Sequence, residues 1–366
     1  MHSKVKILRI EIDGMIVGRM VLSSRNLCVF EYDSEFISKG FSISPFYLPL
    51  RSGVFTAKRD PFNGLFGVFN DSLPDGWGQL LLDRYLQKKG VKLQALSVLD
   101  RLSIVGSAGM GSINYMPDNH IKSSDNAMDL DFMAMEVKKI ISNDKYIDSI
   151  DEIVAKAGSS GGARPKVFID YKGEPWIVKF PSSMDVSNIG EIEYNYSLIA
   201  RKCGIEMTET ELVEGKYFGI KRFDREGDKR IHFHSVSGLL YASHRFSSLD
   251  YIDLIKATYS LTKSMKEVGK MYRQMVFNIL TGNKDDHSKN FAFIYKNNEW
   301  KLSPAYDLVP SIGINDNHTT TINGEGNPKL SDIYKVAKLS GINDSVAKAI
   351  FEEVYSASKE IRTWGS

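Results

Sequence analysis

Apolar and polar residues alternate from residue 4 to about residue 70 in the pattern that is typical of β-strands. The first two strand-like runs lie on either side of Asp13-Gly14, a dipeptide that favours a tight hairpin turn. A third run at 27–32 follows the turn residues 23–26. This pattern predicts a β-rich amino-terminal region, folded as a meander or a small barrel.

The pattern changes to a helical one after the turn cluster 70–76. Trp77, Leu80, Leu81 and Tyr85 recur at a spacing that puts them on one face of a helix. The small residues 106–112 resemble a phosphate loop in composition only, because a strand-like segment follows them where a phosphate loop is followed by a helix. We therefore do not interpret them as a nucleotide site.

A polar, turn-rich stretch at 117–127 predicts a linker and a domain boundary. The next helix has Met133, Val137, Ile140 and Ile141 on one face. From about 154 the pattern is mixed. It predicts strands at 167–170, 175–180, 210–213 and 217–223, with a helix around 192–200 between the two pairs. Beyond about 247 helices dominate.

One polar loop stands out because it lies between a predicted helix and a predicted strand. Met271, Met275 and Ile279 recur at intervals of four and predict a helix that ends near Gly282, while 291–295 is apolar and aromatic like a strand. Rigid flanks of this kind commonly hold functional loops. The loop contains Asp285 and Asn290, and Asp307 follows the next hairpin.

Carboxylate and amide oxygens are the ligands that Mg²⁺ takes beside nucleotide phosphates, so phosphoryl transfer is the first hypothesis. The elements in the rest of the chain follow one another in the order found in kinases: strands with a lysine, a helix with an acid, and a helical half that contains Asp and Asn. Lys179 ends an apolar strand and could pair with phosphates, and Glu193 on the following helix could hold that lysine. Asp285 could accept the proton of an attacking hydroxyl. The segment 222–225 lies where a hinge would bind adenine.

Structural alternatives stay open for several of these residues. Lys179 could be a solvated strand end, and Glu193 a surface helix residue with Glu191 as its competitor. Asp286 is interpreted as a solvated neighbour of Asp285, or as scaffolding. His287 is interpreted chiefly as a loop-packing histidine. His232 and His234 would share a strand face, but no third ligand lies near them in sequence, so we predict no zinc site.

Composition narrows the class of protein. The chain has 366 residues, 42% hydrophobic and 25% charged, which is ordinary for a globular protein of two or three domains. The net charge of +2 provides no overall basic field for nucleic acid, so any DNA contact is expected to come through a partner. Cys28 and Cys203 form no C-x-x-C motif. This cysteine usage favours a location in a reducing cytoplasm. The sequence also lacks a signal-like or membrane-spanning apolar run, which agrees with that expectation.

At these residues the chain resembles the HipA family, serine/threonine protein kinases that act as toxins in bacterial toxin–antitoxin pairs. The segment 69–76 resembles the family's leucine–proline–acid motif and 159–166 its phosphate loop. The run 193–200 resembles its lobe-bracing helix and 222–225 its hinge. The segment 283–291 matches its catalytic loop, and 306–308 its magnesium motif. The resemblance covers nearly the whole chain.

The resemblance implies a role for each matching residue. Asp285 would be the catalytic aspartate, Asn290 and Asp307 the metal ligands, and Glu193 the residue that positions Lys179. Ser159 would be the serine that the kinase phosphorylates on itself, with Ser160 as a competing acceptor. The nucleotide, ATP with Mg²⁺, would be bound by a larger set: Lys179, Ser160, Gly161, Gly162, Lys221, Arg222, Phe223, Asp224, His287 and Lys289.

A phosphoserine in the phosphate loop would bring about two negative charges to the place where the nucleotide phosphates lie. Autophosphorylation is therefore expected to inactivate the enzyme. The family resemblance also implies a small helix-turn-helix antitoxin of the HipB type, through which DNA would be bound. The protein substrate stays open. The family's targets include aminoacyl-tRNA synthetases, but 230–237 lacks the acidic-aromatic pattern common in relatives, and Lys221 stands where better-known members have an acid.

We predict an α+β, two-lobed protein-kinase-like fold. Its parts would be an amino-terminal β-rich subdomain at 1–117, an N-lobe with the Gly-rich loop at 118–225, and a mainly helical C-lobe at 226–366. Two other functions remain open: a non-catalytic nucleotide-binding regulator of a DNA-bound antitoxin, and a small-molecule phosphotransferase, which would share the two-lobed plan.

Overall fold

The computed structural model describes residues 4–123, 129–142, 149–157, 160–183, 185–245 and 249–363. These residues form two compact units. The first contains the chain up to Glu191 together with Glu211–His232, and the second contains Ile192–Thr210 and the chain from Phe233 onward. Part of the predicted linker, 124–127, lies outside the described residues. The boundaries at 117 and 225 stay predictions.

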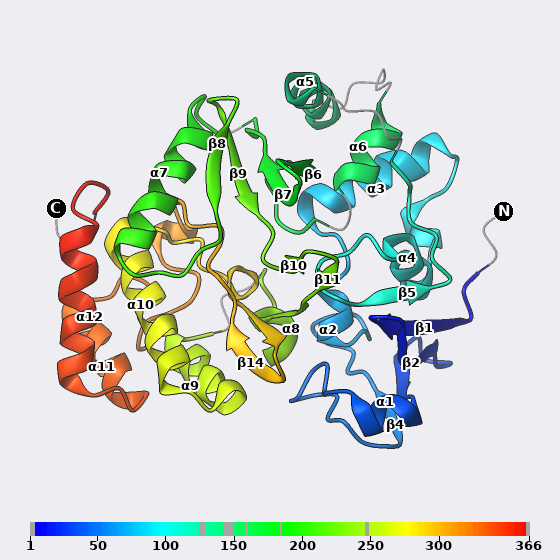
Figure 1. The fold of residues 1–366 in the computed structure, drawn as a ribbon, viewed down its shortest axis with the longest axis horizontal. Coiled ribbons are helices and arrows are strands. Elements are labelled where there is room, and N and C mark those ends of the chain that lie inside the picture. Colours follow the sequence, from blue (N-terminus) through cyan, green and yellow to red (C-terminus); the bar gives the residue numbers. More distant parts are fainter. Residues whose placement is uncertain are drawn as a thin grey trace. The chain divides into compact units, whose positions relative to one another are not determined.

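The first unit begins with an antiparallel sheet in the order β4-β3-β2-β1-β5 (Figure 1). Asp13 and Gly14 form the turn between β1 and β2, both with positive φ, as the hairpin signal predicted. Leu8, Ile10 and Phe30 are completely buried on one face of this sheet. The strands are β1 Ile7–Ile12, β2 Met15–Leu22, β3 Cys28–Tyr32, β4 Val54–Thr56 and β5 Asn114–Met116. The predicted meander is confirmed.

A second sheet of the first unit has the order β6-β7-β9-β8. Its strands are β6 Lys166–Tyr171, β7 Glu174–Lys179, β8 Thr210–Val213 and β9 Tyr217–Lys221. Lys172 and Gly173, both with positive φ, make the turn between β6 and β7. Val167 and Val178 of this sheet are buried in one apolar cluster with Trp77, Ile153 and other helical side chains.

Helices and short strands complete the first unit. Residues Trp77 and Leu81 face the apolar cluster from α3, as their spacing predicted. The elements are α1 Ser34–Lys39, α2 Gly67–Asn70, α3 Gly76–Lys88, η1 Leu93–Ala95, α4 Val98–Val105, α5 Leu130–Ile141, α6 Ile150–Ala157, β10 Arg225–Glu226 and β11 Lys229–Arg230. The helix α7, Ile189–Lys202, begins in the first unit and continues in the second.

The second unit is mainly helical, with the small sheet β12-β13-β14, whose first strand begins at His232, the last residue of the first unit. Its central helix is α10, in which Met271, Met275 and Val276 are completely buried. The elements are β12 His232–Ser235, α8 Val236–Leu240, α9 Tyr251–Thr262, α10 Met265–Thr281, η2 Ser288–Asn290, β13 Ala292–Lys296, β14 Glu299–Leu302, η3 Ile314–Asp316, α11 Leu330–Leu339 and α12 Asp344–Ala357. None of the helices in the described ranges has the length and apolar character needed to cross a bilayer.

The architecture is therefore mixed α+β, with antiparallel sheets and a helical carboxy-terminal region, as the sequence predicted. The helix that was predicted to end near Gly282 is α10, and the strand predicted at 291–295 is β13. Gly282 has a φ of +69° and its N–H donates to the Asn278 carbonyl, so it ends α10 in a left-handed cap that favours glycine.

Candidate active site

The loop between α10 and β13 is fixed by hydrogen bonds to the segment that contains Asp307. Asn283 is buried, and its side-chain amide donates to the Asn278 side chain at 3.1 Å and to the Asp307 carbonyl at 3.5 Å. The Ser311 hydroxyl donates to Asn283 Oδ1 at 3.2 Å and accepts the N–H of Asp285 at 2.8 Å. Hydrogen bonds that involve the side chains of Asn283 and Ser311 thus join the loop after α10 to the segment 307–311.

Asp285 and Asn290 lie at the two ends of the short turn within this loop. The amide nitrogen of Asn290 donates to the Asp285 carbonyl at 2.6 Å, and Asn290 is 9% exposed. With the nitrogen so used, the side-chain oxygen of Asn290 is the atom that can act as a ligand. The Asp285 side chain is 62% exposed, so a hydroxyl of another molecule can reach its carboxylate.

Asp307 has a φ of +55°, a left-handed conformation that is uncommon outside glycine, asparagine and aspartate. Tyr306 next to it donates its hydroxyl to the Lys289 carbonyl at 2.8 Å, which ties this segment to the η2 end of the loop. Such backbone outliers persist where surrounding contacts hold them and are frequent at functional sites. The structure therefore brings Asp285, Asn290 and Asp307 into one hydrogen-bonded assembly.

Asp286 is not the solvated neighbour that one interpretation of the sequence proposed. It is completely buried. Its carboxylate accepts from the Tyr251 hydroxyl at 2.8 Å, from the Thr319 and Thr320 N–H groups at 2.9 and 3.2 Å, and lies 2.8 Å from His318 Nδ1. A buried carboxylate needs partners of this kind. Asp286 anchors the loop to α9 and to 318–320.

His287 and Lys289 follow Asp286 in the loop and contact each other. His287 Nδ1 accepts the Lys289 N–H at 3.2 Å, and the His287 ring packs against that of His244 with centres 5.9 Å apart. Its Nε2 is 3.9 Å from Asp285 Oδ1. These contacts give His287 a packing role. The prediction that His287 and Lys289 contact the nucleotide stays a prediction.

In the first unit, the Gly-rich segment is described from Ser160. Ser159 lies outside the described residues. Ser160 is 2% exposed, and its hydroxyl has no hydrogen-bond partner among the residues that the structure describes. The Gly162 N–H donates to Asp75 Oδ1, from the leucine–proline–acid motif.

Lys179 ends β7 and pairs with Lys166 in the register of the sheet. It is 8% exposed, and its Nζ is 5.3 Å from the centre of the Phe218 ring. Lys179 is therefore not a solvated strand end. Glu193 on α7 is 3% exposed, whereas Glu191 is exposed. Of the two candidate acids on this helix, Glu193 is therefore the buried one. Lys179 belongs to the first unit and Glu193 to the second, so their pairing stays a prediction.

The predicted hinge contains a buried ion-pair network. Arg222 donates to Asp224 through Nε at 2.9 Å and Nη2 at 2.7 Å, and Arg225 donates to the same carboxylate at 2.6 Å. Burial would raise the pKa of Asp224, but Arg222, Arg225 and the Gly111 N–H together hold it below its usual value. Lys221 instead pairs with Glu174 at 2.8 Å. A nucleotide contact here would therefore use the backbone more readily than these side chains.

The same network holds the small-residue segment 106–112. Arg225 donates to the Gly109 and Gly111 carbonyls, and Arg230 to those of Ser107 and Gly111. Burial lowers the pKa of Arg225 to about 9. The backbone of 106–112 is thus held by guanidinium groups through its carbonyl oxygens. The segment therefore forms part of the ion-pair network around Asp224.

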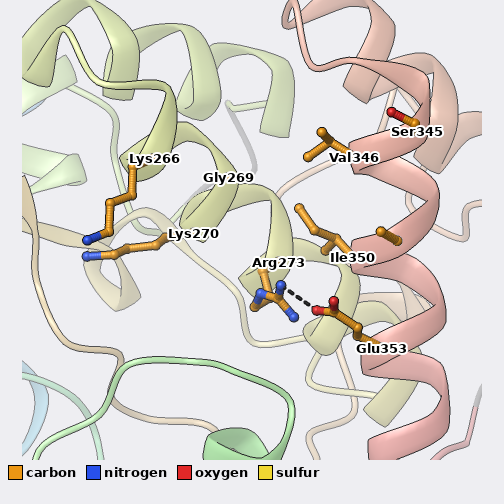
Figure 2. Close-up of a pocket in the computed structure, with 9 residues that line it drawn as sticks. Lys266, Gly269, Lys270, Arg273, Ser345, Val346, Ile350 and Glu353 are labelled. Carbon is orange, nitrogen blue, oxygen red and sulfur yellow. Dashed lines mark hydrogen bonds and ion pairs between the residues drawn. The ribbon is translucent and has the colours of Figure 1, made fainter.

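Away from this loop, a cavity of about 420 Å³ lies between α10 and α12 (Figure 2). Its lining includes Lys266, Lys270 and Arg273 from α10 and Val346 and Ile350 from α12. Arg273 donates to Glu353 at 2.7 Å across the cavity, and Lys270 pairs with Glu206 and Glu267 at 2.7 and 3.0 Å. The cavity contains none of the predicted site residues, and we do not assign the chemistry to it.

Comparison with protein-family models identifies the family of the chain. Residues 8–116 match the family model described as the HipA N-terminal domain, and residues 158–361 match that of the HipA-like C-terminal domain. The chain is therefore an α+β protein that carries both domains of one family. It belongs to the HipA family.

Curated relatives are similar over part of their length. Y4dM of Sinorhizobium fredii, named as a candidate kinase, is 32% identical over 44% of this chain and 44% of its own length. A protein of Haemophilus influenzae with the same kind of name is 27% identical over 41% of this chain and 52% of its own. The chain thus spans about half the length of these relatives. Their names alone do not establish its activity.

A solved structure is similar over nearly the whole chain. It is that of the Shewanella oneidensis toxin–antitoxin system HipA, HipB and its operator DNA complex. The match covers 97% of this chain and 90% of that one, with a TM-score of 0.72 and 18% identity. At this identity the match shows a shared fold, and the predicted fold is confirmed.

Three residues that hold the predicted site segments within their own units were not recognised as such from the sequence. Asp286 was interpreted only as a loop neighbour of Asp285, because its hydrogen-bond partners lie 32 to 35 residues away in the sequence. Arg230 was considered only as part of a substrate-facing segment. Asp75 was assigned to a family motif, but the sequence did not indicate its hydrogen-bond partner, Gly162. For Asp286 and Asp75 the available signal was an acid in a turn that also contains glycine, which is too common to assign a contact, and for Arg230 there was no such signal.

Proposed function

We propose that this protein is an ATP- and Mg²⁺-dependent serine/threonine protein kinase of the HipA type. The observation that carries the proposal is the loop after α10. An exposed carboxylate, Asp285, is held on a backbone that is fixed by Ser311 and Asn290, and the same contacts bring in Asp307. Membership of the HipA family supports this assignment.

In the proposed reaction Asp285 accepts the proton of a serine or threonine hydroxyl as its oxygen attacks the γ-phosphorus of ATP. The new bond is oxygen to phosphorus. The bond from the γ-phosphorus to the β,γ-bridging oxygen breaks, and ADP leaves with that electron pair. Catalysis of this kind depends on positioning and on stabilising charge. The fixed backbone at Asp285 supplies the positioning.

The donor set fits Mg²⁺, which prefers hard oxygen ligands. Asn290 is oriented with its nitrogen engaged, so its oxygen is available, and Asp307 supplies a carboxylate. Bound there, the ion would neutralise charge on the phosphate oxygens of the nucleotide. Asn290 and Asp307 are the residues that we propose to hold it.

The nucleotide would be contacted by residues of the first unit, and Glu193 of the second unit would position one of them. We propose that Lys179 pairs with its phosphates, that Glu193 positions Lys179, and that the backbone of 221–224 contacts adenine. The burial of Lys179 and Glu193 supports these roles, because a buried ammonium and a buried carboxylate each need an opposite charge or a hydrogen-bonding group.

We further propose that Ser159 is the autophosphorylated residue and that its phosphorylation inactivates the enzyme. The burial of Ser160 in this conformation disfavours it as the acceptor. The proposed partner is a small helix-turn-helix antitoxin, with DNA bound only through it. The solved HipA, HipB and operator DNA complex supports that proposal. A cytoplasmic location stays a prediction.

Transfer of label from γ-labelled ATP to proteins of a bacterial lysate tests the proposal. We expect labelled bands with the wild type and none above background with Asp285→Asn. Equal labelling by both proteins would refute the role of Asp285. Expression in a bacterial host separates a kinase from a non-catalytic regulator, because only a kinase loses growth arrest on the Asp285→Asn change.

A further inference from the structure

The amino-terminal domain contacts the Gly-rich loop directly, through the segment 73–77. The Gly162 N–H donates to Asp75 Oδ1, and the Gly162 carbonyl accepts from the Trp77 N–H at 3.0 Å. Both backbone polar groups of Gly162, its N–H and its C=O, are therefore used by two residues that lie 85 or more positions earlier in the chain. We refer to 73–77 as the latch.

Glycines of α3 permit this close approach. A Cβ on Gly76 would lie 2.5 Å from the Gly162 carbonyl oxygen, and Gly76 has a φ of +42°. A Cβ on Gly78 would lie 2.6 Å from the Ser160 carbonyl oxygen. Real Cβ atoms do not approach backbone oxygens so closely, so a side chain at either position would force the loop or the latch to shift. At Gly78 the Cβ would also lie 2.8 Å from the Pro74 Cβ.

The latch is rigid because its helix is anchored in the core. Trp77 is 2% exposed, and its indole N–H donates to the Lys166 carbonyl at 3.2 Å, at the start of β6. Trp77 and Leu81 pack in the same apolar cluster as Val167 and Val178 of the sheet. In Figure 1, α3 lies beside α6, and these helices pack together. Asp75 is thus held in a constant position relative to the strand that ends in Lys179.

A loop containing Gly161 and Gly162 has much conformational freedom, and ordering it on nucleotide binding costs free energy. A contact that orders the loop beforehand lowers that cost and so strengthens binding. We propose that Asp75 is a positioning residue that pre-orders the Gly-rich loop for ATP. The inference rests on the proposed kinase function. It gives the amino-terminal domain a direct part in nucleotide affinity.

Amide hydrogen exchange of the purified full chain tests the contact itself, without any need for activity. Asp75→Ala should speed exchange of the peptide that contains Gly162, and leave peptides from α10 unchanged. Asp75→Asn keeps an oxygen that can accept the Gly162 N–H, so it should restore most of the protection. If Asp75→Ala leaves exchange at Gly162 as in the wild type, the latch does not exist.

Gly78→Ala gives an independent perturbation with a matched control. It places a methyl group against the loop while it raises the helix propensity of α3, so unfolding of the helix is not the expected outcome. Gly269→Ala in α10 is also a helical glycine-to-alanine change, and nothing lies within 4 Å of its Cβ position. Gly78→Ala should expose the loop to exchange and Gly269→Ala should not. Equal exchange in the two variants would contradict the proposed close approach.

The kinetic consequence is a change in KM for ATP. Loss of one pre-ordering contact should raise KM about 10-fold in Asp75→Ala and change kcat much less, since the reacting groups are untouched. A lower KM would overturn the proposal, because it would mean that the Asp75 carboxylate competes with phosphate. If the wild type neither binds ATP nor transfers phosphate, the kinase proposal fails, while the exchange measurement still decides whether the latch exists.

Discussion

The clearest structural contrast in the candidate active site is between two adjacent aspartates. The Asp285 side chain is 62% exposed and Asp286 is completely buried. The same substitution, Asp→Asn, should therefore act differently at the two positions. At Asp286 it should destabilise the fold, and at Asp285 it should stop phosphoryl transfer and leave the fold intact.

The size of the effect follows from the contacts of each Asp286 oxygen. One oxygen accepts two backbone N–H groups, which an asparagine oxygen can still accept. The other accepts from the Tyr251 hydroxyl and lies against His318 Nδ1, and an asparagine NH₂ group cannot accept from either. Hydrogen bonds to a charged group contribute about 1.5–3 kcal/mol each. Rotation of the hydroxyl and a change of His318 tautomer would recover part of two such bonds, so we expect a loss of about 2–4 kcal/mol.

Urea unfolding followed by far-ultraviolet circular dichroism measures this difference. For Asp286→Asn the midpoint should fall by roughly 1 M, given typical slopes for proteins of this size. For Asp285→Asn the free energy of unfolding should stay within about 0.5 kcal/mol of the wild type, as for most exposed positions. Equal midpoints for the Asp286 variant and the wild type would refute the role of Asp286 as a buried anchor.

Three further outcomes follow from the structure. The pKa of Asp224 is below its usual value in the folded protein. The stability that its carboxylate contributes is therefore present above about pH 4 and is lost as pH falls through the folded pKa. The urea midpoints of the wild type and of Asp224→Asn should converge on acidification. Gly282→Ala should cost at least about 1 kcal/mol in thermal unfolding, since Gly282 has a positive φ and its Cβ would lie 2.7 Å from Thr363 Oγ1. After incubation with ATP, fragment mass spectra should locate phosphate on Ser159, and phosphate on Ser160 alone would contradict the proposal.

Local patterns predicted the elements around the site well. The spacing of Met271, Met275 and Ile279 predicted α10, and Gly282 predicted its end, because helix periodicity and the left-handed glycine cap depend on neighbouring residues only. The hairpin at Asp13-Gly14 was predictable for the same reason. The proposed oxygen ligands Asn290 and Asp307 could be named from the sequence because their residue types and spacing lie within one short stretch and its neighbour, and their role stays a prediction.

Contacts between distant segments were not predictable in this way. The environment of Asp286 is set by Tyr251 and by 318–320, and nothing in the loop itself distinguishes it from Asp285. Gly111 donates to Asp224, 113 residues further along the chain. The contact of Asp75 with Gly162 joins two domains of the family. Such pairings depend on the tertiary fold, which periodicity does not specify.

The most direct test of the central claim is the rate of ADP formation from ATP and Mg²⁺ by the purified chain, measured together with its uptake of phosphate. Asp285→Asn should slow both by about 100-fold or more, since general-base catalysis typically contributes that much. Asp344→Asn, at an exposed carboxylate of α12, should match the wild type. Equal rates for the wild type and Asp285→Asn would contradict the assignment of phosphoryl transfer to this loop.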